Sequence, residues 1–132
     1  MDKVALVELL RSRLDGVLAV YAFGSRVQGT ADEGSDLDLA VLVQGYADPL
    51  TLWDLAGEAA DIAGCPVDLL DLRRASTVMQ QQVLTKGERW WAVPGDEAGL
   101  FECAVLSEKL ELDRARAPLL RDIERDGRVY GR

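Results

Sequence analysis

Three short apolar stretches constrain the fold of this chain most strongly. A loop segment separates the first two, and a longer segment with helical periodicity separates the second from the third. The three stretches span residues 17–23, 36–43 and 67–72. Short runs of apolar and β-branched residues that end at glycine or at charged residues are typical of buried strands. Because these strands alternate with helical segments, the pattern predicts an α/β fold in which helices pack against one sheet.

Residues 24–35, between the first two strands, are expected to form a loop with one helical turn at its start, whereas segments with helical periodicity precede the first strand and follow each of the others. Helices are expected at residues 3–15, 49–63, 76–86 and 96–126, with a fourth, shorter strand at 88–93. Pro118 is expected to kink or split the last helix, because it lacks a backbone donor. The apolar residues expected to face the core include Val4, Val7, Leu10, Leu14, Leu50, Trp53, Leu55 and Leu100.

We therefore expect one domain over residues 1–132, with a core at about 3–93 and a C-terminal helical segment at about 96–126. Its fold class is α/β (α+β in some schemes), with a mixed sheet of about four strands flanked by helices.

The charge balance and the missing histidines exclude several functions. Fifteen Lys and Arg against 23 Asp and Glu give a net charge of −8, which argues against duplex nucleic acid as a partner. The chain has no histidine. Ser-His-Asp catalysis, Cys-His catalysis and every zinc site that uses histidine are thereby excluded.

The two cysteines, Cys65 and Cys103, lie too far apart in sequence for a CxxC unit. They predict neither a disulfide scaffold nor a cysteine-rich metal site, and they fit a reduced, cytoplasmic compartment. We expect both to be small, buried packing residues. No apolar run approaches the roughly 20 residues that a membrane span requires, so no membrane partner is expected.

Gly24-Ser25 stands where the first strand runs into an expected helix start. Glycine allows a ligand to approach the backbone closely, and a helix start offers free N–H donors. Together with the Ser25 hydroxyl, this pair could form a small phosphate cradle. The alternative is an ordinary turn that ends a strand.

Asp36 and Asp38 are separated by one residue at the start of the second strand. Side chains two apart on a strand project from the same face, so the two carboxylates repel each other unless a cation neutralises them. Oxygen ligands without histidine favour Mg²⁺ or Mn²⁺. The alternative is a solvated polar face of an edge strand, although residues 39–43 are uniformly apolar, as in a central strand.

Asp68 lies within the third apolar strand. If that strand lies beside residues 36–43, Asp68 can complete a set of three carboxylates around two cations. Asp71 is three residues further on and therefore faces the opposite side. We expect Asp71 to end the strand or to cap the helix after it.

Gly24-Ser25, followed after ten residues by Asp36-x-Asp38, resembles the signature of the nucleotidyltransferase superfamily of DNA polymerase β. The extended motif, residues 24–30 followed by 35–41, is similar to that of small MNT-type nucleotidyltransferases. These proteins are the antitoxin partners of HEPN-domain toxins. The resemblance covers residues 17 to about 93.

The resemblance implies a fold, a reaction and roles for individual residues. The fold is the polymerase β-like mixed sheet, and the reaction is transfer of AMP from ATP to a hydroxyl of a HEPN toxin, usually of a tyrosine, in a type VII-like antitoxin system. The implied nucleotide-binding residues are Gly24, Ser25, Arg26 and Ser35. The implied catalytic residues and ligands of two Mg²⁺ ions (Mn²⁺ being possible) are Asp36, Asp38 and Asp68. Gln28 stands where many relatives carry a second arginine.

Two other functions stay open at this point. One is a non-catalytic antitoxin that binds and occludes its toxin. The other is an antibiotic adenylyltransferase, although those enzymes usually carry a further helical domain. Trp53, Trp90 and Trp91 could stack on an adenine, but tryptophans in a small domain more often anchor a core or an interface.

Overall fold

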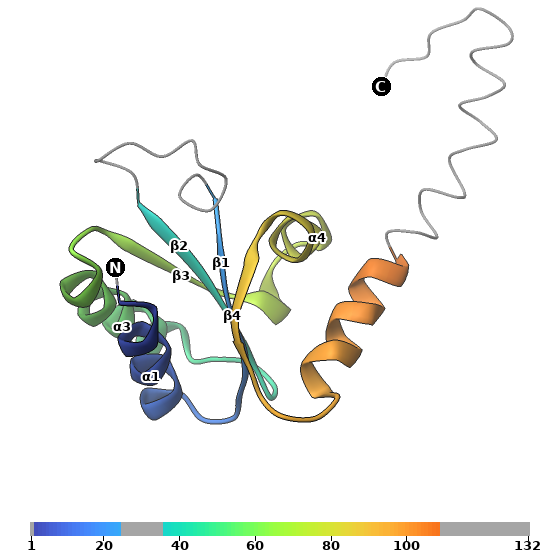
Figure 1. The fold of residues 1–132 in the computed structure, drawn as a ribbon, viewed down its shortest axis with the longest axis horizontal. Coiled ribbons are helices and arrows are strands. Elements are labelled where there is room, and N and C mark those ends of the chain that lie inside the picture. Colours follow the sequence, from blue (N-terminus) through green and yellow to red (C-terminus); the bar gives the residue numbers. More distant parts are fainter. Residues whose placement is uncertain (1, 25–35, 109–132) are drawn as a thin grey trace, which may run out of the picture.

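The computed structural model describes residues 2–24 and 36–108, and its elements follow the predicted order (Figure 1). The elements are α1 (Lys3–Arg13), β1 (Val17–Phe23), β2 (Leu37–Val43), α3 (Pro49–Ala63), β3 (Val67–Asp71), the 3-10 turn η1 (Leu72–Arg74), α4 (Thr77–Lys86) and β4 (Glu88–Ala92). Residues 97–108 are also helical. The predicted strand at 67–72 ends one residue earlier, because Leu72 begins η1.

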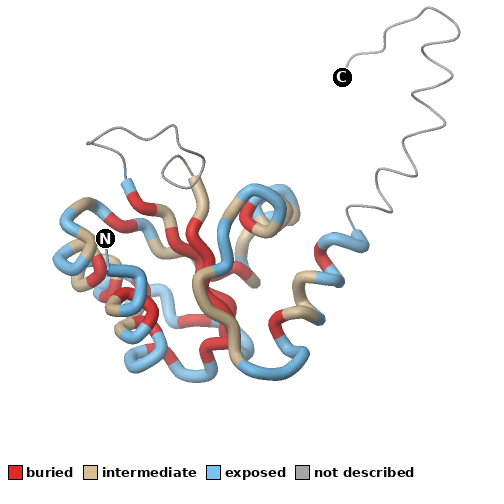
Figure 2. Tube along the Cα trace, in the orientation of Figure 1, coloured by how far each residue is buried: buried red, intermediate tan, exposed pale blue. Residues whose placement is uncertain are grey.

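The four strands form one mixed sheet in the order β3-β2-β1-β4. β1 runs antiparallel to both β2 and β4, whereas β2 and β3 are parallel and are connected through α3. The central strands β1 and β2 are almost completely buried, as their apolar sequences predict (Figure 2). The prediction of a mixed four-stranded sheet flanked by helices is confirmed.

Helices cover both faces of this sheet. α1 and α3 pack on one face, and α4 packs with residues 97–108 on the other (Figure 1). The first core contains Leu6, Leu10, Val20, Leu39, Val41 and Leu55, among others. The second contains Leu18, Tyr21, Ala40, Leu42, Leu72 and Val83. Alternate residues of β2 therefore point into different cores, and this alternation sets the face on which the polar residues of each strand lie.

A β-bulge places two tryptophans on the same face of the sheet. β4 pairs Trp91 with Val20 but Arg89 with Tyr21, so Trp90 is the extra residue. Both indole rings pack against the core under α1, where the Lys3 ammonium lies 5.3 Å from the Trp90 ring and the Arg11 guanidinium lies 4.2 Å from the Trp91 ring. These two tryptophans are thus packing residues.

A buried tyrosine ties the helical segment 97–108 to the sheet. The Tyr21 hydroxyl donates a hydrogen bond of 2.9 Å to Glu102 Oε1, and Arg89 on β4 forms an ion pair of 3.2 Å with the same carboxylate. Burial, followed by the hydrogen bond to Glu102, raises the pKa of Tyr21 far above its ordinary value. Tyr21 is only 2% exposed, so its hydroxyl stays protonated and bonded.

Several apolar residues expected in the core are instead exposed. They are Val4, Leu50, Trp53 and Leu100. Helical periodicity identifies the apolar side of a helix, but the neighbouring elements cover only part of that side. Cys103, expected to be buried, is exposed, and Cys65 is half-buried. Pro118 and the rest of the predicted helix beyond residue 108 lie outside the described residues.

No helix in residues 2–24 and 36–108 is long and apolar enough to cross a membrane.

Candidate active site

The structure brings Asp38 and Asp68 together at one end of the sheet. β2 and β3 are parallel, and their register places Asp38 directly beside Asp68 on the neighbouring strand. Adjacent strands lie about 4.8 Å apart, so the two carboxylates are neighbours. Because Leu37, Leu39 and Val67 enter the core under α1 and α3, both carboxylates project toward the opposite face, on which α4 packs against β1 and β4.

Asp36 precedes β2 and is exposed. It is two residues before Asp38, so strand alternation directs it to the same face, and its charge acts on Asp38. Within the part of the chain that the structure describes, no three Cys, Asp or Glu side chains are grouped closely enough to hold a metal ion as a set. The described geometry therefore contains a pair of adjoining carboxylates with a third acid nearby.

The surroundings of the Asp38 carboxyl disfavour its ionised form. Burial raises its pKa, and the charges of Asp68 and Asp36 and a hydrogen bond with Asp68 raise it further. Burial and neighbouring negative charge both oppose ionisation. A cation at this position would oppose this effect, because it would favour the ionised form of each carboxylate.

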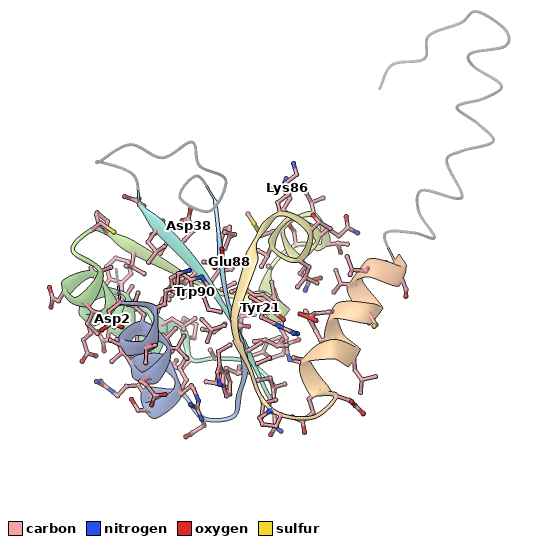
Figure 3. All side chains as sticks on the ribbon, in the orientation of Figure 1. Asp2, Tyr21, Asp38, Lys86, Glu88 and Trp90 are labelled. Atoms are coloured by element: carbon pink, nitrogen blue, oxygen red, sulfur yellow. The ribbon has the colours of Figure 1, made fainter. Side chains whose placement is uncertain are left out.

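Two features favour glycine at position 24, at the end of β1. Its φ is +82°, in the left-handed region that glycine adopts without strain. A Cβ at this position would also collide with Asp38 Oδ2 and lie 3.2 Å from Asp38 Cγ. The sequence indicated a phosphate cradle at Gly24, and the structure adds that this glycine leaves room for the Asp38 carboxylate. Figure 3 shows Asp38 near the end of β2 at which the described chain resumes.

Ser25, Arg26 and Ser35, which the resemblance assigns to nucleotide binding, lie outside the described residues.

Asp71, on the same strand as Asp68, has a structural role. It is 5% exposed, and its Oδ2 accepts a hydrogen bond of 2.8 Å from the Ala47 N–H. Its Oδ1 accepts one of 3.1 Å from the Arg73 N–H, and the Arg74 guanidinium lies 3.5 Å away. The carboxylate caps η1. The interpretation of Asp71 as a residue that ends the strand and caps the next helical turn is confirmed.

A second glycine supports the site, and sequence reasoning missed it. A Cβ at Gly87 would collide with the Val83 carbonyl oxygen and would lie 2.8 Å from the Ala22 carbonyl oxygen. Gly87 thus lets the end of α4 pack directly against Ala22, near the end of β1. The next residue of β1, Phe23, pairs with Asp38. The only signal in the sequence is a glycine between a helix and a strand, which ordinary turns share.

Comparison with known proteins identifies relatives of this chain over most of its length. The family described as polymerase beta, nucleotidyltransferase matches residues 5–91. The protein adenylyltransferase MntA of Shewanella oneidensis is 37% identical over 123 residues, which cover 93% of this chain and 88% of that protein.

Solved structures agree with this relationship. The crystal structure of a toxin–antitoxin with AMP-PNP superposes with a TM-score of 0.77 at 35% identity, covering 94% of this chain and 99% of that one. A structure of the tri-AMPylated Shewanella oneidensis HEPN toxin in complex with MNT antitoxin gives a TM-score of 0.70 at 32% identity, covering 92% and 95%. With its mixed sheet and paired carboxylates, the chain belongs to the polymerase β nucleotidyltransferase family, among its small MNT-type members.

Proposed function

We propose that this nucleotidyltransferase transfers AMP from ATP to a hydroxyl group, that of a tyrosine, on the HEPN-domain protein encoded beside it, and so neutralises that toxin. The observation that carries the proposal is the pairing of Asp38 with Asp68, with Gly24 against Asp38, in a chain of this family. Relatives named protein adenylyltransferase and a relative in complex with an AMPylated HEPN toxin support the substrate and the partner.

The carboxylates fit a hard divalent cation. All their ligand atoms are oxygens. Burial and then the charges of Asp68 and Asp36 raise the pKa of Asp38, and a bound cation would oppose this shift. Asp36 and Asp38 would hold two Mg²⁺ ions (or Mn²⁺), and Asp68 would hold one of them. When bound, such ions stabilise the attacking and leaving oxygens of an in-line displacement.

The residues of the chain itself orient the two substrates. In this proposal Gly24, with Ser25, Arg26 and Ser35, holds the triphosphate. Asp68 is the more exposed of the paired carboxylates and takes up the proton of the incoming hydroxyl. The hydroxyl oxygen forms a bond to the α-phosphorus, the bond from that phosphorus to the bridging oxygen breaks, and pyrophosphate leaves. We place this reaction in the cytoplasm.

Label transfer tests the proposal. The chain is incubated with α-labelled ATP, Mg²⁺ and the neighbouring HEPN protein, and label is expected on a tyrosine of that protein. Substitution of both Asp36→Ala and Asp38→Ala should abolish labelling. As a control, Asp15→Ala should leave labelling unchanged, because Asp15 is an exposed acid that precedes β1, at the end of β1 opposite Gly24. Labelling that persists in the double variant would contradict the mechanism.

Occlusion of the toxin is the second candidate, because an exposed apolar groove lies beside the site. Growth of cells that express the toxin separates the two. An occluding antitoxin still rescues growth with Asp36→Ala and Asp38→Ala, and a catalytic one does not.

A further inference from the structure

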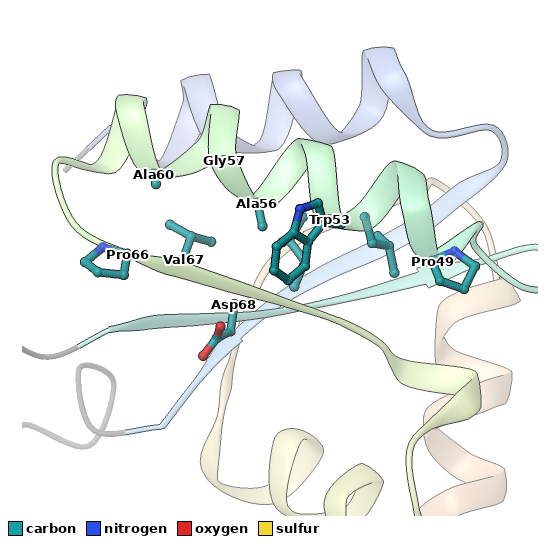
Figure 4. A pocket seen from close by; sticks show the side chains of 10 residues that line it. Pro49, Trp53, Ala56, Gly57, Ala60, Pro66, Val67 and Asp68 are labelled. Atoms are coloured by element: carbon teal, nitrogen blue, oxygen red, sulfur yellow. The ribbon is translucent and has the colours of Figure 1, made fainter.

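A groove of about 640 Å³ runs between α3 and β3, outside the carboxylate face (Figure 4). Its walls are mainly apolar, and they include Pro49, Leu52, Trp53, Ala56, Ala60 and Pro66. Trp53 is 80% exposed, although tryptophan is among the residues most costly to leave in water. Exposed apolar surface of this kind is typical of an interaction site.

The groove ends beside the active site. Val67 and Asp68 contribute to its wall at the end of β3 where Asp68 adjoins Asp38. In Figure 4 Val67 points toward α3, whereas the Asp68 carboxylate points away from it, to the other face. A molecule in the groove therefore lies next to Asp68, whose carboxylate points to the other face, and it contributes to binding more than to chemistry.

The position of β3 leaves this side of the site open. β3 is an edge strand, and on its outer side the described residues supply no strand that pairs with it. Gly24 ends β1, and β2 with Asp38 lies between β1 and β3. If the triphosphate lies on the Gly24 side, as in the proposed function, in-line displacement brings the hydroxyl from the β3 side.

The rim of the groove is acidic. α3 contains Asp54, Glu58 and Asp61 and no Lys or Arg. Glu58 forms an ion pair of 2.8 Å with Arg13 on α1. Asp54 and Asp61 are exposed, and they share a helical face with Leu50 and Gly57 at the outer edge of the groove. Within the described residues no ion pair involves either one, so their charges face solvent.

We propose that this groove docks the acceptor protein: an apolar side chain of the HEPN-domain partner packs against Trp53, and basic residues beside it face Asp54 and Asp61. The proposal rests on the proposed function for the identity of the partner. It adds the surface that holds the partner and the chemistry that recognises it.

Binding without nucleotide tests this surface separately from the chemistry. The dissociation constant of the purified neighbouring HEPN protein is measured for the full chain, for Trp53→Ala and for Leu100→Ala, a control of similar exposure on residues 97–108. Trp53→Ala should weaken binding at least about tenfold, as an exposed anchor residue does, and the control should stay within about twofold. Because Trp53 is exposed, thermal unfolding should show both variants folded.

Two further measurements distinguish the groove from a general loss of activity. In the labelling reaction, Trp53→Ala should raise the KM for the HEPN protein about tenfold and leave kcat and the KM for ATP near their original values. In the double variant with Asp54→Asn and Asp61→Asn, the rate of association with the HEPN protein should depend less on salt concentration.

Equal affinity of Trp53→Ala and Leu100→Ala for the HEPN protein would overturn the proposal. It would also be overturned if sedimentation showed that the groove joins two copies of this chain and that Trp53→Ala separates them. If the wild-type chain binds the HEPN protein through Trp53 but transfers no label, the proposed transfer reaction fails while the docking surface stands.

Discussion

Asp68 and Asp71 lie three residues apart on β3, and the structure places these two acids in opposite environments. Asp71 is buried and is surrounded by donors from Ala47, Arg73 and Arg74. Asp68 is exposed and adjoins a second carboxylate, Asp38. At one end of β3, hydrogen-bond donors and an arginine compensate the charge of Asp71. At the other end, Asp68 lies beside a second carboxyl group and no such donor compensates it within the described residues. Unsatisfied charge of that kind marks the position where a ligand, and not the fold, has to supply the compensation.

Asp38→Asn should have the largest effect and should separate activity from stability. Removing one carboxylate of the pair should lower the rate of label transfer about a hundred- to a thousandfold. Burial and the charges of Asp68 and Asp36 raise the pKa of Asp38 in the folded chain. The corresponding stability is present below the ordinary carboxyl pKa near 4 and is lost as pH rises through the raised value.

Asn cannot ionise, so in EDTA at pH 7 the variant should have a higher free energy of unfolding than wild type, measured by urea denaturation. At about pH 3 the two should converge. With Mg²⁺ added, only the wild-type chain should gain stability from the full carboxylate set. A variant less stable than wild type in EDTA at pH 7 would show that Asp38 belongs to the fold in the same way as Asp71.

Asp71→Ala should have the opposite signature. It removes the acceptor of two backbone N–H groups, one of them buried, and should lower the free energy of unfolding by about 3 kcal/mol. Asp71→Asn keeps one oxygen acceptor and should lose less. Transfer assayed well below the unfolding temperature should stay within about twofold of wild type for Asp71→Asn. A large loss of transfer in a fully folded Asp71→Asn chain would remove the distinction between the two acids.

Gly24→Ala tests how closely β1 approaches the carboxylate pair. The substitution strains a left-handed residue and drives a Cβ into the Asp38 carboxylate, and we expect it to cost about 2 kcal/mol. Gly64→Ala is the matched control, since its φ of +74° is similar and no atom lies within 4 Å of the added Cβ. The control should cost about 1 kcal/mol. Equal losses in urea denaturation would mean that Asp38 moves freely away from Gly24.

Much of the architecture can be predicted from local sequence patterns. The apolar stretch at 17–23 coincides with β1, and glycine or proline marks both ends of α3. The placement of Asp68 and Asp71 on opposite faces is a consequence of strand alternation alone. These features depend on near neighbours in the chain, which a sequence displays directly.

Features that depend on pairing between distant segments could not be predicted in the same way. The close approach of Gly24 to Asp38 depends on the register of β1 against β2, and the packing of both tryptophans on one face depends on a bulge in β4. Trp53 was expected in the core because α3 is apolar around much of its circumference, yet β3 is an edge strand and leaves it exposed. The sequence alone does not show where a sheet ends.

The hydrogen bond from Tyr21 to Glu102 also bears on how the enzyme distinguishes itself from its substrate. Tyr21 lies three residues before Gly24, on the same face of the sheet as the paired carboxylates, and it carries the type of group that the proposed reaction modifies. Its hydroxyl is buried, keeps its proton and is already donated to a carboxylate. Because the side chain is only 2% exposed, a nucleotide bound beside Asp38 would not reach this hydroxyl, and we expect Tyr21 to stay unmodified.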